Sequence, residues 1–236
     1  MRALLVVLSG PVSSERDDAY NDWYTNMHLP DVLAVPGYVR AARYKAFPGD
    51  RSFEQEYLAL YELEVEDLDA LQAVSDEHMR RIEADEMHRS PAETIDRDNV
   101  RSMYFAETGP RLGGHDDVPE TLFMPFTEPV SEEDDEEFNR WYQEVHLPEV
   151  LDVPGFSAAS RYKETGMNMT GRLWPINFPY LALYELGDGT KEAFDNAMKE
   201  LRRRISEGDR MEISETLGSD KITQVYSRIT DRIAAT

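Results

Sequence analysis

Hydrophobic and polar positions follow one another along the chain in a pattern that occurs twice. Each half begins with an apolar run, 2–9 or 120–128, that predicts a strand. In each half a serine followed by acidic residues then indicates the start of a helix. The apolar residues that follow, at spacings of three and four, predict one buried helix face: Tyr20, Trp23, Tyr24 and Met27 in the first half, Phe138, Trp141, Tyr142 and Val145 in the second.

A His-Leu-Pro segment follows each of these helix patterns. Because proline disfavours a helical residue before it, we expect both helices to end there. The later elements are predicted at corresponding positions: strands at 38–46, 55–64 and 100–106 with a helix at 66–86, and strands at 156–164, 179–186 and 221–228 with a helix at 190–207. The order in each half is β-α-β-β-α-β, the plan of a ferredoxin-like unit.

The two halves are also similar residue by residue. Residues 21–45 align with 139–163 at a constant offset of 118, and 15 of the 25 positions are identical. Tyr-Leu-Ala-Leu-Tyr-Glu-Leu at 57–63 occurs again at 180–186. We interpret the chain as a tandem repeat, with these parts: a first repeat at 1–107, a linker at 108–119 and a second repeat at 120–236.

A four-stranded sheet with both helices on one face leaves its other face uncovered. The strand at 55–64 carries Leu58 and Leu60 on one face and Tyr57, Ala59 and Tyr61 on the other, so both faces must be buried. We therefore expect an α+β fold in which two ferredoxin-like repeats pack sheet to sheet within one chain and enclose a lumen.

Charge and composition narrow the classes of partner. The chain has 47 acidic and 25 basic residues, a formal net charge of −22. Such a surface repels phosphate backbones and anionic lipids, so we expect neither nucleic acid nor a membrane as partner. The absence of cysteine excludes disulfides, thiolate metal sites and cysteine nucleophiles. Since no apolar run approaches the length of a membrane span or of a signal peptide, we expect a soluble, cytoplasmic protein.

The first helix and the turn behind it resemble a known family. Both halves read Asn-x-Trp-Tyr-x-x-x-His-Leu-Pro, then an acidic residue, Val-Leu-x-Val-Pro-Gly and an aromatic residue. This segment, within a β-α-β-β-α-β unit, is similar to the EthD-like branch of the dimeric α/β-barrel superfamily. The resemblance covers both halves apart from the linker and an insertion at 165–178.

The resemblance implies a barrel of two ferredoxin-like units around a small-molecule pocket. Members of the superfamily include cofactor-free monooxygenases, polyketide cyclases and dehydratases, lactone isomerases and haem enzymes. The EthD-like branch is linked to the degradation of ethers and aromatic compounds and to aromatic polyketide tailoring. The resemblance therefore implies a hydrophobic ligand and names no reaction.

His28 and His146 are candidate catalytic residues, because imidazole titrates near neutrality and acts as a base or an acid. Tyr24 and Tyr142 lie one turn earlier and can share their faces. A Tyr/His pair suits proton abstraction with stabilisation of an enolate. The alternative is structural, with each imidazole bonding the free carbonyls at a helix C-terminus.

Arg43 and Arg161 lie on the second strand of each half, where a side chain facing the lumen could clamp a carboxylate or an oxyanion. The alternative is a buried ion pair with Glu62 or Glu185 on the adjacent strand. Four tyrosines share strand parity and, facing the lumen, would form an aromatic wall for a flat ligand; plain core packing is the alternative. They are Tyr57, Tyr61, Tyr180 and Tyr184.

The segment 166–178 occurs only in the second half and carries Trp174. So many apolar residues on one loop predict either a lid or a subunit contact. The other histidines, His78, His88 and His115, are expected at the surface. Haem enzymes of the superfamily take a proximal histidine from a helix, but the helix at 190–207 has none and nothing supports the others, so we expect no cofactor and no metal.

We therefore expect a cofactor-independent enzyme of lyase or isomerase type that transfers a proton on a hydrophobic aromatic or polyketide-like molecule. The alternatives are a non-catalytic small-molecule-binding or enzyme-stabilising protein and a cofactor-free monooxygenase. A homodimer of the two-repeat chain is a candidate assembly. Because both halves share the motif, we expect the working site where they differ: at Asn26 and Glu144, Met27 and Val145, Arg40 and Ala158, and 166–178.

Overall fold

The structure, a computed structural model, describes residues 1–49, 52–88, 93–114, 119–209, 211–231 and 233–235. Its elements have the expected order. In the first half they are β1 (Arg2–Ser9), α1 (Asp17–Trp23), α2 (Leu29–Leu33), β2 (Tyr38–Ala46), β3 (Tyr57–Glu64), α3 (Leu68–Glu83) and β4 (Arg101–Glu107). In the second they are β6 (Thr121–Thr127), α4 (Asp135–Trp141), α5 (Leu147–Leu151), β7 (Phe156–Glu164), β8 (Tyr180–Leu186), α6 (Lys191–Glu207) and β9 (Ile222–Arg228).

The strands form one closed antiparallel barrel. Its order is β2-β3-β1-β4-β7-β8-β6-β9, and β9 pairs back onto β2. The two four-stranded sheets therefore join at both edges, with Phe105 opposite Glu164 at one seam and Tyr226 opposite Ala46 at the other. Closure leaves no free strand edge in the barrel, which removes a site of aggregation.

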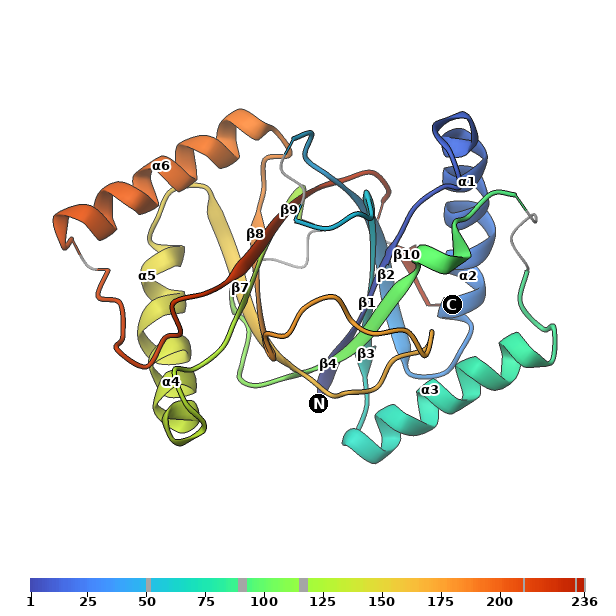
Figure 1. The fold of residues 1–236 in the computed structure, drawn as a ribbon, viewed down its shortest axis with the longest axis horizontal. Coiled ribbons are helices and arrows are strands. Elements are labelled where there is room, and N and C mark those ends of the chain that lie inside the picture. Colours follow the sequence, from blue (N-terminus) through green and yellow to red (C-terminus); the bar gives the residue numbers. More distant parts are fainter. Residues whose placement is uncertain (50–51, 89–92, 115–118, 210, 232, 236) are drawn as a thin grey trace.

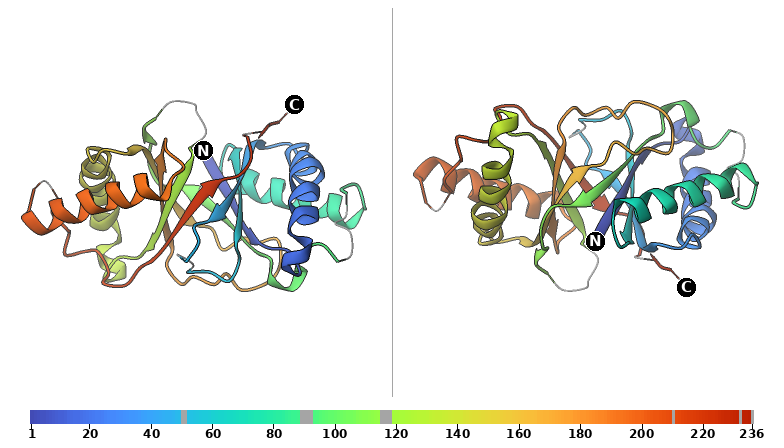
Figure 2. Two further views of the ribbon diagram at one scale, coloured as in Figure 1. Left: turned by 90° about the horizontal axis from the view of Figure 1, so that it is seen from above. Right: turned by 90° about the horizontal axis from the view of Figure 1, so that it is seen from below.

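The helices cover the outside of the barrel on two opposite sides (Figures 1 and 2). Helices α1, α2 and α3 pack on the strands of the first half, and α4, α5 and α6 pack on those of the second. Each sheet is thus buried on its outer face by helices and on its inner face by the other sheet. The expectation that both faces of the strands are buried is confirmed, since Leu58 is 0% exposed and Tyr57 is 1% exposed.

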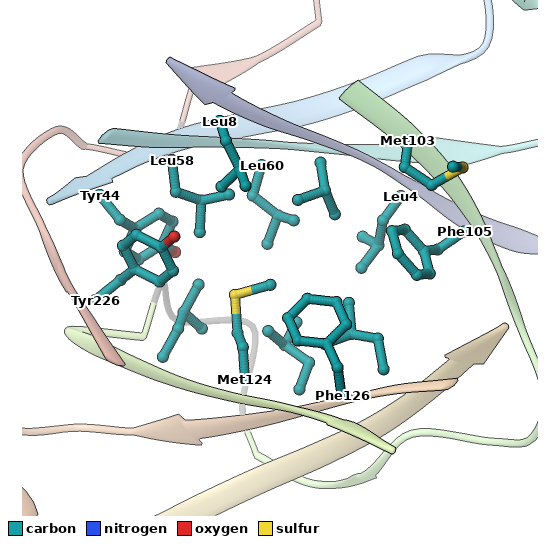
Figure 3. Packing of buried hydrophobic residues seen from close by; sticks show 14 of the residues in the cluster. Leu4, Leu8, Tyr44, Leu58, Leu60, Met103, Phe105, Met124, Phe126 and Tyr226 are labelled. Carbon is teal, nitrogen blue, oxygen red and sulfur yellow. The ribbon is translucent and has the colours of Figure 1, made fainter. Parts of the chain in front are cut away.

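Side chains from both halves fill the interior of the barrel. Leu4, Leu8 and Leu60 point inward from one sheet, toward Met124 and Phe126 of the other (Figure 3). The insertion 166–178 runs across the barrel in Figure 1. Its Trp174 ring is buried in this core, 5.9 Å from the ring of Phe105. The inward-facing tryptophan stabilises the closed barrel and leaves little free space inside.

The first helix of each half does not end at His-Leu-Pro, so this prediction is wrong. A single π-helical turn, Tyr24–His28, follows α1, and α2 continues directly through Pro30. The wider turn pairs the Leu29 N–H with the Tyr24 carbonyl, and proline occupies one of the first positions of α2, where a missing N–H is tolerated. Met27, expected on the buried face, is 41% exposed, whereas Val145 at the same position of the second half is partly buried against the core.

The segment that follows β4 and the segment that follows β9 each pair with a strand of the opposite half. Strand β5 (Leu112–Gly113), within the expected linker, pairs with β7, and β10 (Ile233–Ala234) near the C-terminus pairs with β2. The N–H of Thr108 donates to the carbonyl of Arg161, and that of Ile229 donates to the carbonyl of Arg43. Each half therefore carries a tail from the other half beside its arginine-bearing strand.

Candidate functional site

The predicted arginines and tyrosines lie between the sheets and the helices. On β2, Ala42 and Tyr44 belong to the core inside the barrel, whereas Arg43 points outward. Tyr57 and Tyr61 belong to the core under α1 and α3, and Tyr180 and Tyr184 belong to its counterpart in the second half. The prediction that these residues face the lumen is wrong, because closure of the barrel turns the opposite parity of their strands inward, including Tyr44, Leu58 and Leu60.

Arg43 is completely buried beneath α1. Its guanidinium carbon lies 4.9 Å from the ring centre of Tyr20, 4.4 Å from that of Tyr24 and 5.3 Å from that of Tyr57. Nη1 donates to the Thr25 hydroxyl over 3.1 Å. Among the described residues, Nε and Nη2 have no partner. These two donors are directed into a layer from which water is excluded, and leaving them unpaired is unfavourable.

Arg161 has the same environment in the second half. Its guanidinium carbon lies 3.9 Å from the ring centre of Tyr142, and Nη1 donates to Asn139 Oδ1. The alternative of ion pairs with Glu62 and Glu185 is also wrong, because Glu62 pairs with Arg40 and Glu185 with Arg111. Within the described part of the chain, neither Arg43 nor Arg161 forms an ion pair, so each cation is held by aromatic rings and by hydrogen bonds from Nη1 to uncharged groups.

The histidine of each half stacks on the neighbouring tryptophan. The His28 ring is 4.9 Å from that of Trp23 at an angle of 22°, and its edge contact with Tyr24 is 4.8 Å. His146 repeats this arrangement on Trp141 with an angle of 24°. In the described ranges, neither imidazole forms a hydrogen bond, so the predicted bonds to helix carbonyls are not found. Burial lowers the pKa of both to about 4, which keeps them neutral at pH 7.

One tyrosine links the arginine and the histidine in each half. The ring of Tyr24 has Arg43 over one face and His28 at its edge. Its hydroxyl accepts a hydrogen bond from Tyr61 over 3.4 Å, and burial raises its pKa, so it stays protonated at neutral pH. The structure thus brings together Tyr24, His28 and Arg43 outside the barrel, whereas the sequence predicted only that Tyr24 and His28 share a helix face.

His78 is a residue whose place the sequence analysis missed. It was expected at the surface, but it is 2% exposed on the inner face of α3. Nδ1 lies 2.9 Å from the Tyr38 hydroxyl, which lies 2.7 Å from the Tyr104 hydroxyl. Burial lowers the pKa of His78 to about 3. The spacing of seven residues from the buried Leu71 is the signal that predicts a shared helix face.

A surface hollow of about 470 Å³ lies beside Arg43. Asn21, Thr25 and Asn26 form one wall, and residues 229–231 and 233 form the other. Thr25 both lines the hollow and bonds the guanidinium. In the second half Gln143 stands at the position of Thr25 and donates to the Pro110 carbonyl, so its longer side chain bridges the corresponding gap.

The barrel interior offers much less room. A cavity of about 90 Å³ lies at one end, lined by Tyr44, Ser160 and Tyr162 beside the Arg40–Glu62 and Arg111–Glu185 pairs. Sites for small organic molecules typically occupy about 300–1,000 Å³. An aromatic ligand of several rings is therefore too large for this cavity, and neither His28 nor His146 lines it.

The structure places one of the two histidines considered as haem ligands inside the fold and the other at its surface. His78 is enclosed in the layer under α3 and bonded to Tyr38, and His88 bonds the carboxylate of Asp31; His115 lies outside the described residues. In the part of the chain that the structure describes, no three His, Cys, Asp or Glu side chains are grouped to hold a metal ion. The described helices also include none that is both long and apolar enough to cross a membrane.

Several solved structures have a similar fold. An anthrone oxidase-like protein aligns with a TM-score of 0.55 and 12% identity over 99% of this chain and 93% of that chain. A protein from Lactobacillus acidophilus NCFM, named for a monooxygenase activity, gives 0.54 and 10% identity over 99% and 98%. A chlorite dismutase from Candidatus Nitrospira defluvii gives 0.52 and 10% identity over 96% and 91%. No protein-family model matches the sequence, and no curated protein matches it.

Identities this low show a common fold and transfer no activity. The closed eight-stranded barrel with helices on its outside is the architecture that these structures share with the chain. The chain therefore shares the overall fold of these solved structures, a closed barrel of two four-stranded sheets with helices on its outside.

Proposed function

We propose that the protein is a cofactor-independent enzyme that transfers a proton on a hydrophobic aromatic or polyketide-like molecule. One observation carries this proposal: a buried guanidinium with two unpaired donors and a neutral, unbonded imidazole flank the same tyrosine ring. Such a guanidinium stabilises negative charge, and such an imidazole accepts a proton. Together they are suited to forming an enolate or a phenolate.

In the proposed reaction the substrate oxygen binds the free Nε and Nη2 of Arg43. His28 removes a proton from a carbon or hydroxyl of the substrate, and the electron pair moves onto the bound oxygen. The developing negative charge raises the pKa of the adjacent imidazole toward neutrality. His28 then returns the proton to another carbon in an isomerisation or to a leaving hydroxyl in a dehydration. The hollow beside Asn21 and Thr25 offers the approach to Arg43.

Two solved structures with this fold are named for oxidase-like and monooxygenase activities. Their names favour a second candidate function, oxygenation without a cofactor. It begins with the same deprotonation, after which the carbanion adds to molecular oxygen; the O–O bond of the resulting peroxide then breaks, which leaves a carbonyl group on the substrate and releases water. Oxygen consumption coupled to loss of the substrate separates the two reactions, because proton transfer alone consumes none.

The finer assignments of the chain are proposals as well. We infer a tandem repeat of EthD-like type, with units at 1–107 and 120–236 joined by 108–119; the identical positions and the repeated order of elements support it. A homodimer stays a prediction that light scattering after gel filtration tests. A cytoplasmic location stays a prediction as well.

The probe for the proposed reaction is anthrone, whose C10 methylene group exchanges hydrogen when the ketone enolises. In D₂O, proton NMR follows loss of the C10 signal with and without the protein. We expect the wild type to accelerate this exchange, and we expect His28→Ala, His146→Ala or both to lower it by about 10²–10⁴-fold. If both single variants exchange anthrone as fast as the wild type, the proton-transfer proposal is wrong.

A further inference from the structure

Three residues in the helix–sheet layer of the first half have apolar counterparts in the second. Tyr38 corresponds to Phe156 in the aligned helix-one segment, and His78 corresponds to Leu201 on the second helix. Tyr104 lies opposite Leu5 in the middle of β4, where Val225 lies opposite Phe123 in β9. The second half therefore lacks the hydrogen-bonded group that Tyr38, His78 and Tyr104 form in the first half. The Trp, Tyr, His and Arg of the repeated motif are present in both halves.

The three residues form a chain of hydrogen bonds that ends on a free nitrogen. Tyr104, Tyr38 and Nδ1 of His78 are joined over 2.7 and 2.9 Å. Nε2 of His78 is buried and, among the described residues, has no partner. Whichever way the donors and acceptors of these hydrogen bonds are arranged, Nε2 of His78 is left without a partner, as a donor in one tautomer and as an acceptor in the other. A buried polar atom of this kind is rare in a stable core unless another group binds it.

Ring contacts connect the His78 group to the residues around His28. The Tyr38 ring packs against the His78 imidazole at 5.5 Å between centres, and His28 adds to the lowering of the His78 pKa that burial causes. The Tyr38 ring also contacts that of Tyr61, whose hydroxyl bonds Tyr24. The His78 group is therefore continuous with the Tyr24, His28 and Arg43 cluster. In the second half the same region of α6 presents Leu201 to the core.

We propose that the first half holds the working site and that Nε2 of His78 hydrogen-bonds a hydroxyl or carbonyl oxygen of the flat, hydrophobic molecule held at His28. Tyr38 is a positioning residue, because its hydroxyl holds the imidazole ring in place and, with Tyr104, selects its tautomer. This inference rests on the proposed function. It assigns the ligand a polar oxygen on the side of the α3 helix, in addition to the oxygen at Arg43. The second half keeps the architectural motif without this contact.

The test uses 1,8-dihydroxyanthraquinone as a probe, since it is flat and carries hydroxyl and carbonyl oxygens but no C10 methylene. Its binding to the full chain is followed by its visible absorption. Tyr38→Phe removes one oxygen atom and reproduces the residue of the second half; we expect it to weaken binding about tenfold. His78→Leu, which reproduces Leu201, is expected to weaken binding at least as much. Tyr226→Phe is the matched control, because it removes a buried hydroxyl inside the barrel, away from the helix–sheet layer, and it should bind the probe as the wild type does.

If His78 had only a structural role, the ¹⁵N resonances of its imidazole would not move when the probe binds. In ¹⁵N-histidine spectra, the His78 Nε2 resonance should move when the probe binds to the wild type, and Tyr38→Phe should lose the single tautomer. Tyr38→Phe also keeps the test decisive if His78→Leu does not fold.

Equal binding by wild type, Tyr38→Phe and His78→Leu would overturn this inference and leave the proposed function intact. Absence of probe binding to the wild type would overturn it as well. If the wild type also fails to exchange anthrone, the proposed function is overturned with it.

Discussion

Three histidines with lowered pKa values, His28, His78 and His146, make the stability of the protein dependent on pH between neutrality and pH 5. Burial lowers the pKa of His28 and His146 to about 4 and that of His78 to about 3, from an ordinary value of 6.5. Between pH 6.5 and pH 4 the unfolded chain therefore binds more protons than the folded one. Stability is highest above pH 6.5 and is lost as the pH falls through that value.

The size of the loss follows from the same values. At pH 5 the unfolded histidine is almost fully protonated while folded His78 is neutral, so His78 contributes a loss of about 2 kcal/mol relative to pH 7. The rings of His28 and His146 are half-buried, and solvent screening reduces their share to about 1 kcal/mol each. The total is about 4 kcal/mol, a large fraction of the stability of an ordinary domain. Most carboxylates titrate below this range and contribute little.

Urea unfolding at pH 7, 6 and 5, followed by circular dichroism, measures this effect. The free energy of unfolding of the wild type should fall steadily across the series. His78→Leu should lose about 2 kcal/mol less than the wild type over the same range, whatever its stability at pH 7. A wild type that is equally stable at pH 7 and pH 5 would refute the reasoning. So would a His78→Leu variant whose loss equals that of the wild type.

Three substitutions test other parts of the structure. Gly37 has φ +105°, and a Cβ added there would lie 2.5 Å from Val74 Cγ2, whereas Gly155 has a similar φ and no contact this short. In urea unfolding, Gly37→Ala should therefore lower the free energy of unfolding by about 1–3 kcal/mol more than Gly155→Ala does. Equal losses in the two variants would contradict the clash. Trp174→Ala should cost about 3–5 kcal/mol and open a cavity in the barrel that binds indole; an unchanged unfolding midpoint would show that the ring does not fill the core. Arg43→Met replaces a buried cation that has no acidic partner among the described residues. It should change the free energy of unfolding by under about 2 kcal/mol while lowering anthrone exchange about 10²-fold or more, and retained exchange would exclude the oxyanion role.

Much of the fold could be predicted from local pattern. The strand periodicity and the order of elements are properties of short stretches of chain, and the structure confirms them within a few residues. The pairing of Tyr24 with His28 on one helix also follows from spacing alone. Pro30 misled the prediction, because a proline marks a helix end only when no wider turn accommodates it, and the π turn before it does so here.

The sequence alone determined that Arg43 and Tyr44 point to opposite faces of their strand. The spacing of His78 from Leu71 also indicated a shared helix face, although His78 was expected at the surface. The sequence could not decide which face becomes the interior of the barrel, because that depends on how two distant edges close. It also could not place His78 beside Tyr38, 40 residues away, or Tyr38 beside Tyr104, 66 residues away. Periodicity describes neighbours within one element, whereas a buried site is made of contacts between elements, and only the tertiary structure creates those.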